Sequence, residues 1–214
     1  MFKKVIFDVD GVLVDSAPEM YRGCRAVFAQ LGQGLRVPSY DDFLKTVQTP
    51  FSVYYRELGV KGTDEEITRA YFSAARHDEA PLFPDVINTL QALADANVRL
   101  AIVSGHHQAS LEKRFTERGL ADYFDAIVGN ASNKVEAIRR LCASAGVDPE
   151  STCLVGDLIS DARDGRDAGV KVVGCTRGNP TMHALRHAGA HHVIRDLDGL
   201  VHLIHSNPSV AASC

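Results

Sequence analysis

The sequence has no basic excess, no long apolar run and no low-complexity tract or internal repeat. Lysine and arginine together number 23 against 27 aspartates and glutamates, a formal net charge of −4. This balance gives no surplus of cations to follow a nucleic-acid backbone. No run of about 18 apolar residues, the length that predicts a membrane span, occurs. We therefore expect neither nucleic acid nor a membrane as a partner.

Cysteines are few and show no paired spacing. The five are Cys24, Cys142, Cys153, Cys175 and Cys214. Secreted folds of this size usually carry even numbers of paired cysteines, so scattered thiols favour a reducing, cytoplasmic location. The short apolar stretch near the N-terminus reaches Asp8 too early to serve as the apolar region of a signal peptide.

The rest of the composition is ordinarily globular, with 45% hydrophobic and 23% charged residues in 214. This length fits one domain, or a core with a smaller insert, and can bury a core without disulfide or metal crosslinks. Short β-branched runs alternate with amphipathic helical patterns, which predicts a parallel sheet covered on both faces. Strands are expected at residues 4–9, 98–103, 126–128, 152–155, 170–174 and 192–194, and helices at 84–96, 107–118, 133–145 and 161–168.

A helical segment separates the first strand from the others. Ser16 to Glu19 and Thr63 to Glu66 each have the spacing of a capping box at a helix start. Further helices are predicted at 39–47 and 50–58. The fold class is therefore α/β, a doubly wound, Rossmann-like parallel sheet with a small all-helical cap. We expect a core of residues 1–14 and 83–206, a cap of residues 15–82, and a flexible tail at 207–214.

Acidic residues follow two of the predicted strands. Asp8 and Asp10 end the first strand, and Asp157 and Asp161 follow the strand at 152–155. Carboxylates at such positions can act as a nucleophile, an acid/base or metal ligands. The alternative is that they only cap turns and helices, which we expect to describe part of the role of Asp161.

Two further candidates accompany these carboxylates. Ser104 and Gly105 follow the second strand, where a hydroxyl and free backbone N–H groups can hold phosphate oxygens, although Ser-Gly is also an ordinary turn. Lys134 starts a helix, where the helix dipole disfavours a cation, so it is either bound to an anion or solvated. His106 and His107 directly follow Gly105, and two histidines at a helix start are more often solvated than catalytic.

The carboxyl ends of parallel strands meet at one edge of a sheet, so these groups are expected to share one cleft. Four carboxylates within several ångströms repel one another, by roughly 1 to 4 kcal/mol for each close pair. A divalent cation removes this cost, and all-oxygen ligands favour magnesium over zinc. Magnesium, a lysine and a hydroxyl together indicate a phosphate site.

The residues from Asp8 to Ser16 closely resemble the first motif of the haloacid dehalogenase superfamily, in its phosphatase branch with a helical cap. Ser104, Lys134 and Gly156-Asp157 with Asp161 are similar to the later motifs in order and spacing. The resemblance covers nearly the whole chain. It implies a hydrolase acting on a small phosphorylated metabolite, similar to phosphoglycolate phosphatases.

The same resemblance implies a role for each residue. Asp8 would form an aspartyl-phosphate, and Asp10 would protonate the leaving oxygen and later deprotonate water. Magnesium would be held by Asp8, Asp157 and the Asp10 carbonyl, with Asp161 orienting the metal shell or Lys134. The phosphoryl group would bind Ser104, the Gly105 amide and Lys134. Relatives that act as dehalogenases lack a carboxylate at position 10, so that activity is not expected.

Three alternatives remain open at this level, and one of them is a degenerate binding protein on the same fold, against which the four intact motifs argue. A sugar phosphomutase of the β-phosphoglucomutase type would use the same nucleophile, and cap residues that the sequence does not define would distinguish it. A receiver-like signalling module also combines acidic residues, a hydroxyl and a lysine. Such modules are shorter, lack the insert, and place the phosphorylated aspartate on a later strand.

Overall fold

The computed structural model describes residues 2–48, 50–179 and 181–205, so the predicted tail at 207–214 and Cys214 lie outside the described residues. Six strands form one parallel sheet in the order β3-β2-β1-β4-β5-β6. This confirms the predicted α/β class. The strands are β1 (Lys4–Phe7), β2 (Arg99–Val103), β3 (Ala126–Val128), β4 (Thr152–Gly156), β5 (Lys171–Cys175) and β6 (His192–Ile194).

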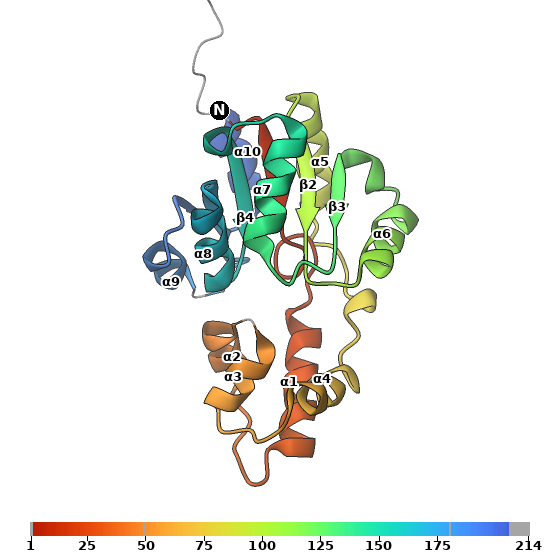
Figure 1. The fold of residues 1–214 in the computed structure, drawn as a ribbon, viewed down its shortest axis with the longest axis vertical. Coiled ribbons are helices and arrows are strands. Elements are labelled where there is room, and N and C mark those ends of the chain that lie inside the picture. Colours follow the sequence, from red (N-terminus) through yellow and green to blue (C-terminus); the bar gives the residue numbers. More distant parts are fainter. Residues whose placement is uncertain (1, 49, 180, 206–214) are drawn as a thin grey trace, which may run out of the picture.

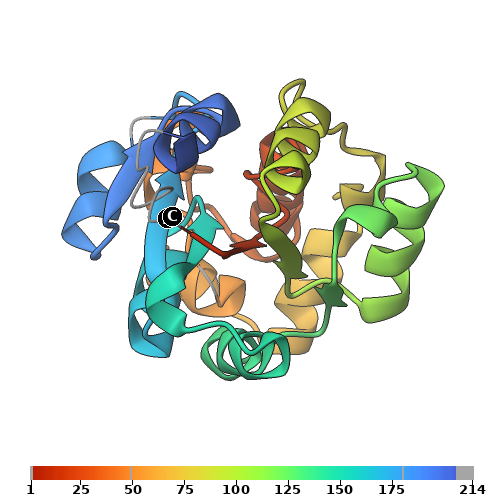
Figure 2. The same cartoon turned by 90° about the horizontal axis from the view of Figure 1, so that it is seen from above.

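Helices cover both faces of the sheet, as the view from above shows (Figure 2). Val5 and Phe7 of β1 pack on the side of α5 (Val86–Asp95) and α10 (Leu197–His205), whereas Ile6, which points the opposite way, packs on the side of α7 (Lys134–Ala145). A strand buried on both faces must be continuously apolar, which explains the β-branched run. The core helices are α5 (Val86–Asp95), α6 (Gln108–Glu117), α7 (Lys134–Ala145), α8 (Ile159–Ala168), α9 (Met182–His187) and α10 (Leu197–His205), with short 3-10 turns η2 (Ala121–Tyr123) and η3 (Pro149–Ser151).

The insert after β1 is helical and has its own apolar core. It contains α1 (Ala17–Leu31), α2 (Tyr40–Thr46), α3 (Phe51–Glu57), α4 (Asp64–Phe72) and the 3-10 turn η1 (His77–Glu79). Phe28, Phe43, Tyr55 and Ile67 are buried together in this core. Figure 1 shows the insert set apart from the sheet and its covering helices. The predicted boundaries at residues 14/15 and 82/83 remain a prediction.

The chain leaves and re-enters the core through two adjacent segments. Asp15 N donates to Pro81 O at 2.9 Å, and Phe83 N donates to Leu13 O at 3.1 Å. An isolated antiparallel bridge joins Val14 to Leu82 between these bonds. The insert is therefore attached to the core through one short two-stranded connection.

The two predicted capping boxes have different outcomes. The box from Thr63 to Glu66 is present, with both reciprocal hydrogen bonds at the start of α4. The prediction of a capping box at Ser16 is wrong, because the Ser16 side chain accepts no capping hydrogen bond. The Ser16 hydroxyl is directed at Met20 Sδ, 3.7 Å away. The carboxylate of Glu19 instead accepts a hydrogen bond from the backbone N–H of Arg76 at 2.9 Å. Glu19 thus connects the two ends of the insert.

The cysteines within the described residues are free thiols, as expected, and all four are buried. Burial raises the pKa of Cys24 to about 12. No helix in the described parts of the chain is both long and apolar enough to span a membrane.

A buried cation lies at the start of the central strand β1. The Lys4 side chain is 1% exposed and donates to both carboxylate oxygens of Asp125, at 2.9 and 2.8 Å. Arg99 also donates to Asp125, at 2.9 Å. A buried ammonium without a partner would be costly, so Asp125 is required where Lys4 lies in the sheet.

We predict that Asp125→Ala destabilises the protein by about 3 kcal/mol, because it leaves the Lys4 charge buried and unpaired. Lys4→Met should cost about 1 kcal/mol or less, since Asp125 is partly exposed and keeps Arg99. Urea denaturation followed by circular dichroism measures both changes. Asp122→Ala, at a nearby exposed carboxylate, is the control, and an equal loss for Asp122→Ala and Asp125→Ala would contradict the prediction.

Candidate active site

Asp8 lies at the end of β1, between the ends of β2 and β4. Its backbone N–H donates to Val155 O at 2.9 Å, which continues the pairing with β4 beyond the strand. The Asp8 side chain is buried. Gly11 turns the following backbone with a φ of +68°, a conformation that non-glycine residues rarely adopt. A β carbon at Gly11 would also fall within contact distance of the Asp157 carboxylate.

Asp157 and Asp161 follow β4, as predicted. One ligand atom each from Asp8, Asp157 and Asp161 lie within 4.8 Å of one another. Asp161 takes part in capping the helix, as expected, but from inside its first turn: its carboxylate accepts from the N–H of Leu158, the N-cap residue of α8, at 3.1 Å. Gly156 makes room for it, because a β carbon there would meet the Asp161 side chain.

Lys134 is bound to anions rather than solvated. Its Nζ lies 2.7 Å from Asp161 Oδ1 and 3.1 Å from Asp8 Oδ1. Lys134 is the first residue of α7, and the Asn133 side chain caps the helix by accepting from Glu136 N. The unfavourable helix dipole is therefore outweighed by two carboxylates.

The charges in this cluster are out of balance. Burial and the neighbouring Asp161 raise the pKa of Asp8 to about 7, although Lys134 lowers it. Burial, Asp161 and Asp8 raise the pKa of Asp157 well above its usual value. Burial by itself lowers the pKa of Lys134. The carboxylates of Asp161 and Asp8 outweigh burial and raise that pKa above its usual value. Three carboxylates with one ammonium leave a deficit of positive charge that suits a divalent cation.

Ser104 and Gly105 follow β2, the strand next to β1. Ser104 is buried, and its hydroxyl accepts from the backbone N–H of His106 at 3.2 Å. Gly105 is exposed, with open space where a side chain would stand. The turn therefore presents its backbone beside the carboxyl end of β1.

Asp10 lies apart from the three carboxylates and contacts two histidines. His106 Nε2 is 2.6 Å from Asp10 Oδ2, and His77 Nδ1 is 3.6 Å from Asp10 Oδ1. Burial favours the protonated form of Asp10, but the hydrogen bond to His106 and the nearby His77 outweigh burial and hold the pKa of Asp10 well below its usual value. Burial lowers the pKa of His106, but the bond to Asp10 raises it overall.

The sequence gives little sign of His106 as a partner of Asp10 and none of His77. His107 is exposed, as expected of a solvated histidine, whereas His106 reaches Asp10. His77 comes from the insert, and its Nε2 lies 2.7 Å from the Tyr71 hydroxyl. The sequence around His77 has no motif, and only the packing of the insert against the core places it near Asp10.

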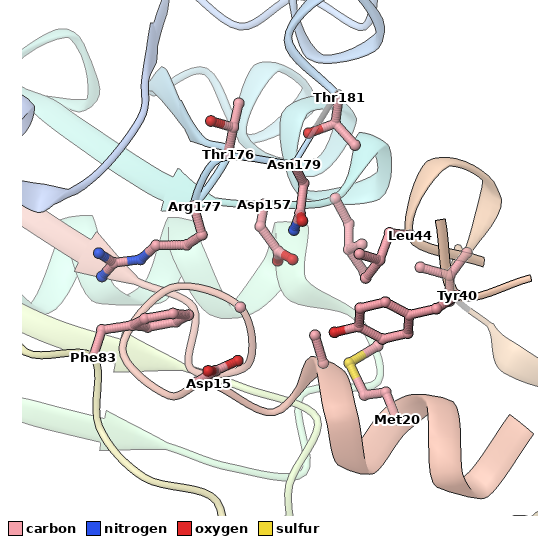
Figure 3. A pocket seen from close by; sticks show the side chains of 14 residues that line it. Asp15, Met20, Tyr40, Leu44, Phe83, Asp157, Thr176, Arg177, Asn179 and Thr181 are labelled. Carbon is pink, nitrogen blue, oxygen red and sulfur yellow. The ribbon is translucent and has the colours of Figure 1, made fainter. Parts of the chain in front are cut away.

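A cavity of about 220 Å³ lies beside Asp157, between the insert and the core. In Figure 3, Tyr40 and Met20 face Asp157 and Asn179 across it. The Arg177 guanidinium lies 4.0 Å over the Phe83 ring and pairs with Asp85. The cavity therefore has an apolar wall on the insert and a polar wall on the core.

Comparison with known proteins places the chain in a family. The sequence model of the family of haloacid dehalogenase-like hydrolases matches residues 5–175 of this chain. A phosphoglycolate phosphatase from Agrobacterium fabrum is 30% identical over 188 residues, covering 81% of this chain and 80% of the relative. The chain belongs to the haloacid dehalogenase-like hydrolase family. It is thus a hydrolase, and this membership argues against the receiver-like alternative.

Other relatives carry different names, and solved structures share the fold. An N-acetylmuramic acid 6-phosphate phosphatase from Pseudomonas putida is 27% identical, covering 82% of this chain and 83% of the relative. A predicted phosphatase from Clostridium acetobutylicum has a TM-score of 0.81 at 22% identity, covering 97% of this chain and all of the other (100%). A haloacid dehalogenase-like hydrolase from Streptococcus pneumoniae has a TM-score of 0.78 at 20% identity, covering 96% and 99%.

We predict that Gly11→Ala weakens divalent-cation binding at least tenfold, since the new methyl group displaces the Asp157 carboxylate. Gly34→Ala is the matched control, because Gly34 also has a positive φ (+87°) but faces open space. Both variants should lose about 1 kcal/mol of stability from backbone strain. Calorimetric titration with Mg²⁺ and urea denaturation separate the two effects; equal cation affinity in both variants would refute the displacement.

Proposed function

We propose that this hydrolase is a magnesium-dependent phosphatase that cleaves small phosphate monoesters through an aspartyl-phosphate at Asp8. The observation that carries the proposal is the buried Asp8 carboxylate, held 3.1 Å from Lys134 and grouped with Asp157 and Asp161. A buried carboxylate beside a cation, in a cluster with more carboxylates than cations, is suited to receive a phosphoryl group with a metal ion.

The reaction has two displacements. An Asp8 oxygen attacks phosphorus, and the bond from phosphorus to the ester oxygen breaks as Asp10 protonates that oxygen. Asp10 then takes a proton from water, whose oxygen attacks phosphorus, releasing inorganic phosphate and restoring Asp8. Lys134, the Ser104 hydroxyl and the Gly105 amide hold the phosphoryl oxygens in this scheme. Positioning and charge neutralisation supply most of the catalysis in such transfers.

The donor set fits magnesium. Asp8 offers a buried carboxylate oxygen and Asp157 a half-buried one, the Asp10 carbonyl is the proposed third ligand, and Asp161 holds Lys134 in place. When bound, Mg²⁺ neutralises the carboxylates and polarises a phosphoryl oxygen. The raised pKa values of Asp8 and Asp157 support this assignment, because they reflect carboxylates that cannot all ionise without a cation.

His106 supports the acid/base role proposed for Asp10. The low pKa of Asp10 by itself disfavours proton donation, since the carboxylate is ionised at neutral pH. The short bond to His106, whose pKa is raised, keeps a proton within 2.6 Å of Asp10 Oδ2. We propose that the pair supplies the proton together, with Asp10 facing the leaving oxygen.

The substrate is proposed to be a small phosphorylated metabolite. The cavity of about 220 Å³ beside Asp157 is below the range of pockets for drug-sized ligands, roughly 300 to 1,000 Å³. The relatives named for phosphoglycolate and for N-acetylmuramic acid 6-phosphate differ in substrate size. The small cavity favours a phosphoglycolate-like ester. Separately, the buried free thiols support the predicted cytoplasmic location. A screen of phosphorylated metabolites for hydrolysis against isomerisation tests the phosphomutase alternative.

We predict that Asp8→Asn abolishes hydrolysis of para-nitrophenyl phosphate, because the amide cannot attack phosphorus. Rapid acid quench followed by mass spectrometry should detect a phosphoryl adduct on Asp8 in the wild type and none in the variant.

Asp167→Asn, at an exposed aspartate on α8, is the matched control and should keep full activity. Turnover by Asp8→Asn comparable to that of Asp167→Asn would rule out Asp8 as the nucleophile.

Magnesium affinity should fall as the pH is lowered through about 7. Burial raises the pKa of Asp8 to about 7 in the ion-free protein, so below that pH Asp8 carries a proton that the ion must displace. Each pH unit below 7 should weaken binding by up to about tenfold for one displaced proton. Calorimetry in two buffers of different ionisation enthalpy counts the protons, and equal affinities at pH 6 and pH 8 would contradict the pKa assignment.

A further inference from the structure

Three side chains from separate segments converge at the junction of insert and core. Asp10 follows β1, His106 follows β2, and His77 lies in η1 of the insert, which Figure 1 shows between α4 and the core. One ligand atom from each of the three lie within 4.8 Å of one another. This group is distinct in its side chains from the cluster of Asp8, Asp157 and Asp161.

Two atoms that face each other in this group have no partner. Asp10 Oδ1 and His77 Nδ1 are both buried and make no hydrogen bond within the part of the chain that the structure describes. They are 3.6 Å apart, and His77 is only 8% exposed. Buried polar atoms without partners are costly, so a ligand between them would remove a real penalty.

The donors of this group differ from those of the acidic cluster. Two imidazole nitrogens and one carboxylate oxygen suit Zn²⁺ and similar transition-metal ions, whereas Mg²⁺ prefers oxygen donors alone. Zinc with two histidines, one carboxylate and a fourth open position is a common arrangement in proteins. The donor chemistry therefore separates the two sites by metal.

The distances to Asp10 require small adjustments, and the ligand atoms, which lie within 4.8 Å of one another, must draw closer around an ion. Ligands about 2.0 to 2.1 Å from a tetrahedral zinc lie roughly 3.3 Å from each other. The His77 Nδ1 to Asp10 Oδ1 distance of 3.6 Å is close to that value, and the His106 Nε2 to Asp10 Oδ2 distance of 2.6 Å must lengthen by less than 1 Å. The two imidazole rings are already crossed, with centroids 5.5 Å apart and planes at 73°.

Tyr71 fixes the orientation of His77. Its hydroxyl lies 2.7 Å from His77 Nε2, and the two rings stack with centroids 5.6 Å apart. Histidine ligands usually donate their second ring N–H to such a partner, which leaves the other nitrogen free for metal. With Nε2–H donating to Tyr71, His77 Nδ1 presents a lone pair toward Asp10.

We propose that Asp10, His77 and His106 form a second metal site, selective for Zn²⁺ and similar transition-metal ions, whose occupancy inhibits the enzyme. Inhibition, but not binding, rests on the proposed function, because a metal on the Asp10 carboxylate removes the acid/base group. The ion would also join the insert to the core through His77.

Binding is tested on the full chain, with Mg²⁺ saturating and without substrate. Calorimetry should show one Zn²⁺ bound per chain, and Co²⁺ as a probe should give visible absorption bands of a nitrogen-ligated ion. His106→Gln and His77→Gln should each weaken Zn²⁺ binding on the order of 100-fold, and Tyr71→Phe about tenfold. Thermal unfolding checks that each variant is folded.

His107→Gln is the matched control, because His107 is adjacent to His106 but exposed, and it should bind Zn²⁺ as the wild type does. Unchanged affinity in His106→Gln and His77→Gln would overturn the site. So would loss of Zn²⁺ binding in Asp157→Asn but not in His106→Gln, since that places the ion in the acidic cluster.

Inhibition is measured separately, with para-nitrophenyl phosphate and saturating Mg²⁺. Wild-type turnover should fall with Zn²⁺ at the concentrations that fill the site, and a zinc-selective chelator should restore it. Zinc binding without loss of turnover would overturn the inhibitory role. Absence of any phosphatase activity, with zinc binding as expected, would overturn the proposed function and support the site.

Discussion

The shortage of positive charge around Asp8 is the constraint on which the site depends. Asp8, Asp157 and Asp161 lie within 4.8 Å of one another, with Lys134 as the cation that contacts two of them. Burial prevents water from screening these charges, and this raises the pKa values of Asp8 and Asp157. The same energetic cost supports the proposal that this cluster binds magnesium beside the phosphoryl group.

The fold brings these residues together through the order of its strands. β1 lies in the middle of the sheet, between β2 and β4, so the residues after three adjacent strands meet at one edge. Gly11 and Gly156 then allow the Asp157 and Asp161 side chains to approach the backbone closely. The geometry of the cluster is thus a property of the rigid core, whereas the insert supplies His77 and one wall of the cavity.

The sequence predicted the core more fully than the insert. Asp8, Lys134, Asp157 and Asp161 could be placed together because strand ends in a parallel sheet have a fixed relation. His77 could not, since its approach to Asp10 depends on how helices far apart in sequence pack. Likewise Ser16 has the sequence of a capping box, but the carboxylate of Glu19 is taken by Arg76, a contact across 57 residues that local spacing does not reveal.

The two segments that connect insert and core have a consequence for how such enzymes diversify. Because residues 13–15 and 81–83 run antiparallel and hydrogen-bonded, the chain departs from and returns to nearly the same point. A different lid, longer or shorter, can be spliced in there while the catalytic sheet keeps its shape. Selection can then alter what the enzyme admits by exchanging this module, without rebuilding the machinery that performs the chemistry.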